Sequence, residues 1–111
     1  MDMRTINTLQ FFENATSPKE SEILMNGNGS QLILDISGSA ETFALQVLGK
    51  ATIKDGTQWT PIGAINLSDF NIATTIATKG IYALPVDGIG CIKANLTEVN
   101  GAISVAGKVG E

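Results

Sequence analysis

Residues 42–54 read TFALQVLGKATIK, in which every second residue from Phe43 to Ile53 is apolar or glycine. One face of this run carries Phe43, Leu45, Val47, Gly49, Ala51 and Ile53, whereas the other carries Gln46, Lys50, Thr52 and Lys54. Successive side chains of a β-strand point to opposite sides, so a period of two is typical of a strand. The run therefore predicts a long strand with one buried face and one wet face.

A hairpin is predicted directly after this strand. Asp55-Gly56 is a strong signal for a tight turn, and Trp59 opens a return strand that extends to about residue 67. Pro61 interrupts that return strand and has no backbone N–H to donate. We therefore expect the return strand to lie at a sheet edge or to carry a bulge near Pro61.

The same style of sequence continues on both sides of this hairpin. Further β-type runs occupy residues 31–37, 72–78, 81–86, 92–96 and 103–109, with a turn signal at Asp87-Gly88 and a hairpin signal at Asn100-Gly101. Short strands with turns every 8–12 residues are typical of sandwiches and jelly rolls. The sequence thus predicts an all-β fold, a single antiparallel β-sandwich or jelly-roll-like domain of about eight strands.

The first thirty residues have a less regular pattern. Residues 8–13 and 21–25 have the composition of short strands, and residues 26–30 read NGNGS, which indicates a loop. Residues 1–30 are therefore interpreted as an N-terminal segment in front of a sandwich body at 31–111, within one domain. This segment forms either the first strands of the same sandwich or an arm that grips a neighbouring subunit.

Composition excludes several kinds of chemistry. The 111 residues include no histidine and one cysteine, which removes histidine bases, histidine metal ligands and intramolecular disulfides. A net charge of −4 disfavours nucleic acid as a partner. No apolar run approaches a membrane span and the start has no signal-peptide pattern, so synthesis in a cytoplasm is expected. We expect no enzyme activity, no catalytic residue, no metal and no cofactor.

The negative charge is concentrated in the first part of the chain. Residues 1–48 hold six acidic and two basic residues, whereas residues 49–111 hold five of each. Within the first part, Glu13, Glu20 and Glu22 are candidates for an acidic segment that meets a basic partner. An ordinary solvated surface is the alternative interpretation.

A few other residues are candidates for binding. Trp59 and Tyr82 could stack on a ligand such as a sugar, although a place in the core or at its rim is the commoner fate of such rings. Cys91 could be a reactive thiol beside Lys93, or simply a packed side chain. The aspartates are scattered, and two of them belong to Asp-Gly turns, which gives little support for a calcium site.

A family resemblance covers roughly residues 40–111. It rests on the stretch 49–67 with Asp55-Gly56, Trp59 and Pro61, on Gly80-Ile-Tyr82, and on the glycine-rich close at 101–109. This order of motifs resembles small β-sandwich structural proteins of tailed bacteriophages and prophages of Gram-positive bacteria. The resemblance implies that Asp55, Gly56, Trp59 and Tyr82 are fold determinants.

The same resemblance implies a function in assembly. It points to a non-enzymatic virion protein, a head decoration or a tail or neck component, that forms homo-oligomers and contacts other virion proteins. Such a protein would be assembled in the bacterial host cytoplasm and end in the virion. The alternative is a carbohydrate-binding module that recognises a cell-surface glycan.

Overall fold

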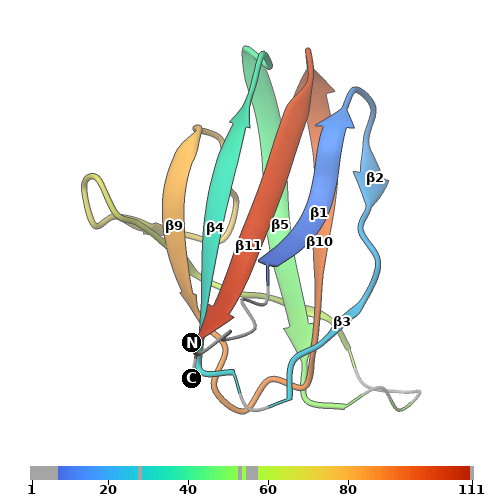
Figure 1. Cartoon of the computed structure of the whole chain (residues 1–111), viewed down its shortest axis with the longest axis vertical. Helices are drawn as coiled ribbons and strands as arrows, with labels where there is room; N and C mark the ends of the chain where they lie inside the picture. The colour runs from blue at the N-terminus through green and yellow to red at the C-terminus, as the bar shows by residue number, and fades with distance from the viewer. Residues whose placement is uncertain (1–7, 28, 53, 55–57, 111) are drawn as a thin grey trace, which may run out of the picture.

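Two antiparallel β-sheets lie face to face in the computed structural model, which describes residues 8–27, 29–52, 54 and 58–110. Figure 1 shows β9, β4, β11 and β1 side by side in one layer, with β5 and β10 in a second layer behind them. This two-layer arrangement confirms the predicted all-β fold of two antiparallel sheets. In the part of the chain that the structure describes, no helix is present that is long and apolar enough to cross a membrane.

The first sheet has six strands. In spatial order they are β1 (Thr8–Ala15), β11 (Ile103–Gly110), β4 (Gln31–Gly38), β9 (Gly80–Pro85), β7 (Ala64–Asn66) and β8 (Ile72–Ala73). The long strands β11 and β4 are paired over eight residue positions, so they form the centre of this layer.

The second sheet has five strands. In spatial order they are β2 (Lys19–Glu20), β10 (Cys91–Asn100), β5 (Thr42–Lys50) and β6 (Thr60–Pro61), and β3 (Leu24–Met25) also pairs with β10. Eleven strands are thus found among the described residues where about eight were expected. Four of the eleven have only two residues, which is too short for a periodicity to reveal.

The core lies between the two sheets and follows the predicted alternation. On β5 the side chains of Phe43, Leu45 and Val47 are buried, and on β4 those of Leu32 and Leu34 are fully buried. Inward residues of both layers interdigitate in a sandwich, and their burial is the main source of its stability.

The strand predicted over residues 42–54 is shorter in the structure. β5 ends at Lys50, and Ala51 and Thr52 are exposed and outside any strand. The partner strand β10 begins at Cys91, which pairs with Lys50, so the pairing that supports β5 ends at this position. The predicted turn residues Asp55 and Gly56 lie outside the described residues.

The single return strand predicted over residues 59–67 was wrong, because this segment changes sheets. Thr60 pairs with Gly49 in the five-stranded sheet, whereas Ile65 pairs with Ala83 in the six-stranded sheet. The switch falls at the buried Ile62 and at Gly63. Pro61 sits on β6 at the end of its sheet, which agrees with the expected edge position.

The run at residues 72–78 also departs from one continuous strand. Only Ile72 and Ala73 belong to β8, and the chain then returns to the other sheet, where Ile76 forms an isolated bridge with Leu45. The buried Ile76 side chain explains this excursion, since it fills the core beside β5.

The hairpin predicted at Asn100-Gly101 was wrong as well. β10 and β11 belong to different sheets, so the turn carries the chain across the sandwich. Gly101 has a φ of 113°, and a Cβ on it would lie 2.7 Å from the Cα of Ala40. Glycine is needed here both for the positive φ and for the close approach of the two backbones.

The N-terminal segment contributes to both layers. β1 pairs with β11 at the edge of the six-stranded sheet, and the short strands β2 and β3 pair with β10 in the other sheet. The β1 ladder is irregular between Gln10 and Ala15, which is typical of a bulged edge strand. Residues 8–25 therefore run along one open side of the sandwich.

Candidate functional site

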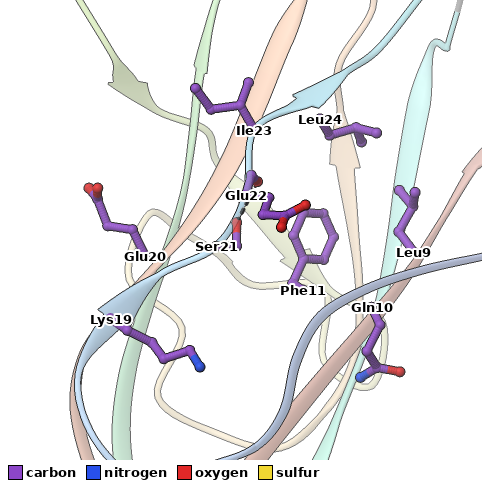
Figure 2. A pocket seen from close by; sticks show the side chains of 9 residues that line it. All are labelled: Leu9, Gln10, Phe11, Lys19, Glu20, Ser21, Glu22, Ile23 and Leu24. Atoms are coloured by element: carbon purple, nitrogen blue, oxygen red, sulfur yellow. Dashed lines mark hydrogen bonds between the residues drawn. The ribbon is translucent and has the colours of Figure 1, made fainter.

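A groove lies on this open side, between β1 and the segment that includes β2 and β3 (Figure 2). Its volume is about 510 Å³. Its apolar part is formed by the partly buried side chains of Leu9, Phe11 and Leu24. Gln10 and the polar residues at 19–22 complete the lining.

The three predicted acidic residues take different places around this groove. Glu20 and Glu22 belong to its lining, and Glu13 lies outside the lining on β1, exposed to solvent. Figure 2 shows the Glu22 carboxylate beside the Phe11 ring and the Glu20 side chain turned away from it. Glu20 instead forms an ion pair with Lys93, with 3.1 Å between Oε2 and Nζ.

Trp59 marks a second polar cluster, on the outer face of the five-stranded sheet. Its partly exposed ring has the Lys50 Nζ at 4.9 Å and the Lys93 Nζ at 4.6 Å from the ring centroid. Cations within about 6 Å of an indole face are attracted by its quadrupole. We call Trp59, Lys50, Lys93 and Glu20 the indole–lysine cluster.

Tyr82, the other aromatic residue that the motifs singled out, lies in the core. It is 4% exposed, and its hydroxyl donates to the Thr78 carbonyl at 2.9 Å. A buried phenol needs such a partner, and this bond ties β9 to the preceding loop. Trp59 is therefore the more accessible ring of the two.

The outer face of the six-stranded sheet carries several apolar side chains, although this face points away from the core. The strand register brings Ile72 beside Ile65, Ile65 beside Ala83, and Ala83 beside Ile33. Ile72 is 69% exposed, and Ile81, on the next row, is 48% exposed. We define the outer apolar face as Ile33, Ile65, Ile72, Ile81 and Ala106, together with Leu67 and Phe70 at its margin.

This face also contains a shallow hollow and one pair of opposite charges. The hollow has a volume of about 260 Å³ and is lined by Ile33, Asp35, Ile81, Ala106, Gly107 and Lys108. Asp35 and Lys108 are exposed on adjacent strands, since Asp35 pairs with Ala106 and Lys108 with Ile33. The face thus carries both an acid and a base around an apolar centre.

Phe70 stands out at the margin of this face. It is 73% exposed, and its φ of 61° is in the left-handed region, which is unusual for an aromatic residue. The turn is held by local bonds, because the Phe70 N–H donates to the Asn66 carbonyl and the Asn71 N–H to the Asp69 carboxylate. This face was not predicted from the sequence. The signal that could have revealed it is isoleucine at outward positions, where the alternation predicts polar side chains.

Cys91 is buried, and its Sγ lies 3.7 Å from the Met25 sulfur of β3. The short strand β3 therefore covers the thiol on the side where the alternation alone would expose it. Within the ranges that the structure describes, no three cysteine, aspartate or glutamate side chains gather as a metal-binding group.

The fold defines the protein as an antiparallel β-sandwich that has the long strand β1 at one sheet edge and the two-residue strands β2, β6 and β8 at other edges. The chain belongs to the XepA family, because the family model matches residues 5–109. A search of curated proteins found no sequence match.

Two solved structures are similar to this fold. The SPBc2 prophage-derived protein YomS matches with a TM-score of 0.84 and 22% identity over 98% of this chain and 96% of that chain. The PBSX exported protein XepA matches with a TM-score of 0.86 and 24% identity over 98% of this chain. The match covers 39% of the XepA chain, so this protein corresponds to less than half of that relative.

Proposed function

We propose that this protein is a non-enzymatic structural protein of a phage or prophage and that it works by assembling with copies of itself. Its membership of the XepA family, and the similarity of its fold to that of a prophage-derived protein, support the phage origin. The observation that carries the assembly is the outer apolar face, with Ile72 69% and Phe70 73% exposed.

The apolar surface gives a physical reason for self-association. Burying apolar surface contributes about 25 cal/mol per Å², and contiguous exposed patches of this kind mark interaction surfaces. A second copy suits this face in charge as well, because Asp35 and Lys108 lie on it together. In a two-fold interface each acid can meet the base of the other copy, which gives self-complementarity.

A matched pair of lysine substitutions tests the assembly. Ile81 and Ile23 are 48% and 46% exposed, and they lie on the outer apolar face and in the lining region of the groove respectively. The molar mass of the wild type, Ile81→Lys and Ile23→Lys should be measured by light scattering after size exclusion over a range of concentrations. We expect an oligomer for the wild type and Ile23→Lys, and a smaller species for Ile81→Lys.

Two outcomes contradict the proposal. A wild type that stays monomeric at high concentration removes self-assembly altogether. An oligomer that survives Ile81→Lys but dissociates with Ile23→Lys removes the outer apolar face as the interface and assigns it to the N-terminal side. Circular dichroism of each variant separates dissociation from unfolding.

The proposal places the protein in the virion, next to other virion proteins, after assembly in the host cytoplasm. The exposed carboxylates of Glu13 and Glu22 are the proposed contacts for a basic partner of this kind. Mass spectrometry of purified particles tests the location, and peptides of this chain in stoichiometric amount are expected. Particles that lack the chain exclude a virion component.

Glycan recognition is the second candidate function, and the partly exposed ring of Trp59 favours it. An indole can stack on the apolar side of a sugar ring, as protein aromatic side chains do with flat partners. A Trp59→Ala variant that keeps full binding in a glycan assay would remove this candidate.

A further inference from the structure

We propose that the indole–lysine cluster on the five-stranded sheet binds an anionic glycan, a polysaccharide whose sugar units carry carboxylates. This inference deepens the second candidate function, glycan recognition, and does not depend on self-assembly. It rests on the position of one partly exposed indole within 5 Å of two lysine ammoniums (4.9 and 4.6 Å). The partly exposed indole supplies an apolar surface, and the two ammoniums that lie over the ring supply positive charge there.

The charges in the cluster are not balanced. Lys93 is mostly covered, with 14% of its side chain exposed, and it is paired with Glu20 at 3.1 Å. Among the described residues, Lys50 has no carboxylate within ion-pair distance, and its Nζ lies 4.9 Å from the centroid of the Trp59 ring. Among the residues that the structure describes, the cluster thus holds two lysines and one glutamate, on a protein whose net charge is −4.

The strand register explains why these groups meet. Lys50 pairs with Cys91, and Lys93 pairs with Leu48, so both lysines lie on the same outer face of β5 and β10. β6 runs beside β5 with Thr60 opposite Gly49, which brings the preceding residue, Trp59, to the same end of that face. The site is thus built on the regular strands β5 and β10, and its lysines are held in register.

The chemistry favours a carboxylated sugar over a polynucleotide. Proteins that bind single-stranded nucleic acid use an extended basic groove, with neutralisation of several phosphates. Here the positive charge is limited to one site, and Glu20 offsets part of it. A lysine ammonium beside a stacking surface suits one carboxylate on one sugar unit, because charge-assisted hydrogen bonds to carboxylates are strong and local.

The single tryptophan makes the site directly observable. Trp59 is the only tryptophan in the chain, so the intrinsic tryptophan fluorescence of the whole protein reports on this cluster alone. The protein should be titrated with tetragalacturonate, a carboxylated probe, and with maltotetraose, a neutral one. We expect tetragalacturonate to change the Trp59 emission saturably, and the change to weaken as salt is raised.

Two charge-neutralising variants locate the binding. Lys50→Gln should raise the dissociation constant of tetragalacturonate about fivefold, the scale of one charge-assisted contact. Lys79→Gln removes an equal charge from an exposed position just before β9 of the other sheet, so it serves as the control and should change the constant less than about twofold.

Each contrary result has a separate meaning. Equal responses to maltotetraose and tetragalacturonate would overturn the anionic preference and leave glycan recognition standing. No saturable response to either probe overturns the site and the glycan candidate together. Equal weakening by Lys50→Gln and Lys79→Gln, or tighter binding of a thymidine oligonucleotide, overturns the proposed ligand in favour of unspecific or nucleic-acid attraction.

Discussion

The two sheets share one core but have very different outer faces. The six-stranded sheet presents isoleucines outward, with Ile72 69% and Ile81 48% exposed. The five-stranded sheet presents a tryptophan ring with two lysines and an ion pair. The inner faces of the two sheets are alike because both are buried in the same core. The outer faces differ, so we expect separate functions of the sandwich to lie there.

Alternation along a single strand does not show what covers the outer face of a sheet. The outward residues of β4 include Gln31, Ile33, Asp35 and Ser37, and those of β5 include Ala44, Gln46, Leu48 and Lys50, so neither strand is apolar on both faces along its length. A strand that is apolar on both faces is typical of burial on both faces. The apolar outer face of the six-stranded sheet is instead assembled from several strands, with Ile33 on β4, Ile65 on β7, Ile72 on β8 and Ile81 on β9.

The strongest test of the comparison uses adjacent residues on β4. Leu34→Ala removes a fully buried side chain and should lower the free energy of unfolding by about 2–5 kcal/mol, through lost burial and a cavity. Ile33→Ala, on the outer face, should cost less than about 1 kcal/mol at concentrations where the protein is monomeric. Urea unfolding followed by circular dichroism measures both.

The stability cost of Ile33→Ala should also depend on the protein concentration. If the outer apolar face is buried between copies, the cost of Ile33→Ala should grow as the protein concentration rises, because assembly is linked to folding. Equal costs for Leu34→Ala and Ile33→Ala in the monomer would contradict the division between inner and outer faces.

A second prediction concerns Asn26, which links the two sheets at one end. The Asn26 side-chain amide nitrogen lies 3.0, 3.1 and 2.8 Å from the carbonyl oxygens of Gly29, Val86 and Ile89, and the Asn26 Oδ1 has no hydrogen-bond partner among the described residues. Asn26→Ala should destabilise the fold by about 1–3 kcal/mol, because buried carbonyls lose their donor.

The isosteric change at the same position should be more harmful. Asn26→Asp replaces the donor with an oxygen that faces the same three carbonyls, so repulsion adds to the lost hydrogen bonds. We expect a lower midpoint of thermal unfolding for Asn26→Asp than for Asn26→Ala at neutral pH. The opposite order would mean that the amide is rotated, with its oxygen toward the three carbonyls.

The sequence predicted the parts of this fold that depend on long periodic strands. β4, β5 and β9 lie close to where the alternation placed them, and the buried faces match. The sheet change at Ile62 and the crossing at Gly101 were not predictable, because a turn signal does not say which sheet the next strand joins.

The candidate sites were predictable only in part. Trp59 was singled out by its type and its position, but its approach to Lys93 depends on the pairing of β5 with β10, which sequence spacing does not reveal. The groove between β1 and β2 depends in the same way on contacts between distant segments. Isoleucine at outward positions was the sequence signal for the outer apolar face, and only the register shows that these isoleucines are neighbours.

A third prediction uses the strained turn at Phe70 to separate stability from assembly. Asparagine tolerates the left-handed region better than phenylalanine, so Phe70→Asn should stabilise the monomer by up to about 1 kcal/mol. The same change removes an apolar ring that is 73% exposed, so it should weaken self-association. Differential scanning calorimetry and light scattering measure the two effects.

Opposite signs for stability and assembly would support retention of Phe70 for contact with another copy. If Phe70→Asn lowers the unfolding temperature of the monomer, the ring contributes to the fold. Phe70 is then retained for the fold and not for contact with another copy.

The smallest effect on stability is expected on the other face, at Glu20. Glu20→Gln breaks the ion pair with Lys93, and its cost should stay within about 1 kcal/mol, because the Glu20 side chain is 55% exposed and solvent screens the pair. The same change leaves both lysines of the indole–lysine cluster without a carboxylate partner among the described residues, so tetragalacturonate should bind more tightly. Glu98→Gln, an exposed acid elsewhere on β10, is the matched control for the change in net charge. A gain in affinity for Glu20→Gln alone would show that Glu20 competes locally with the ligand for the lysines. Equal gains in Glu20→Gln and Glu98→Gln would mean that only the net charge matters, which weakens the contrast between the two faces.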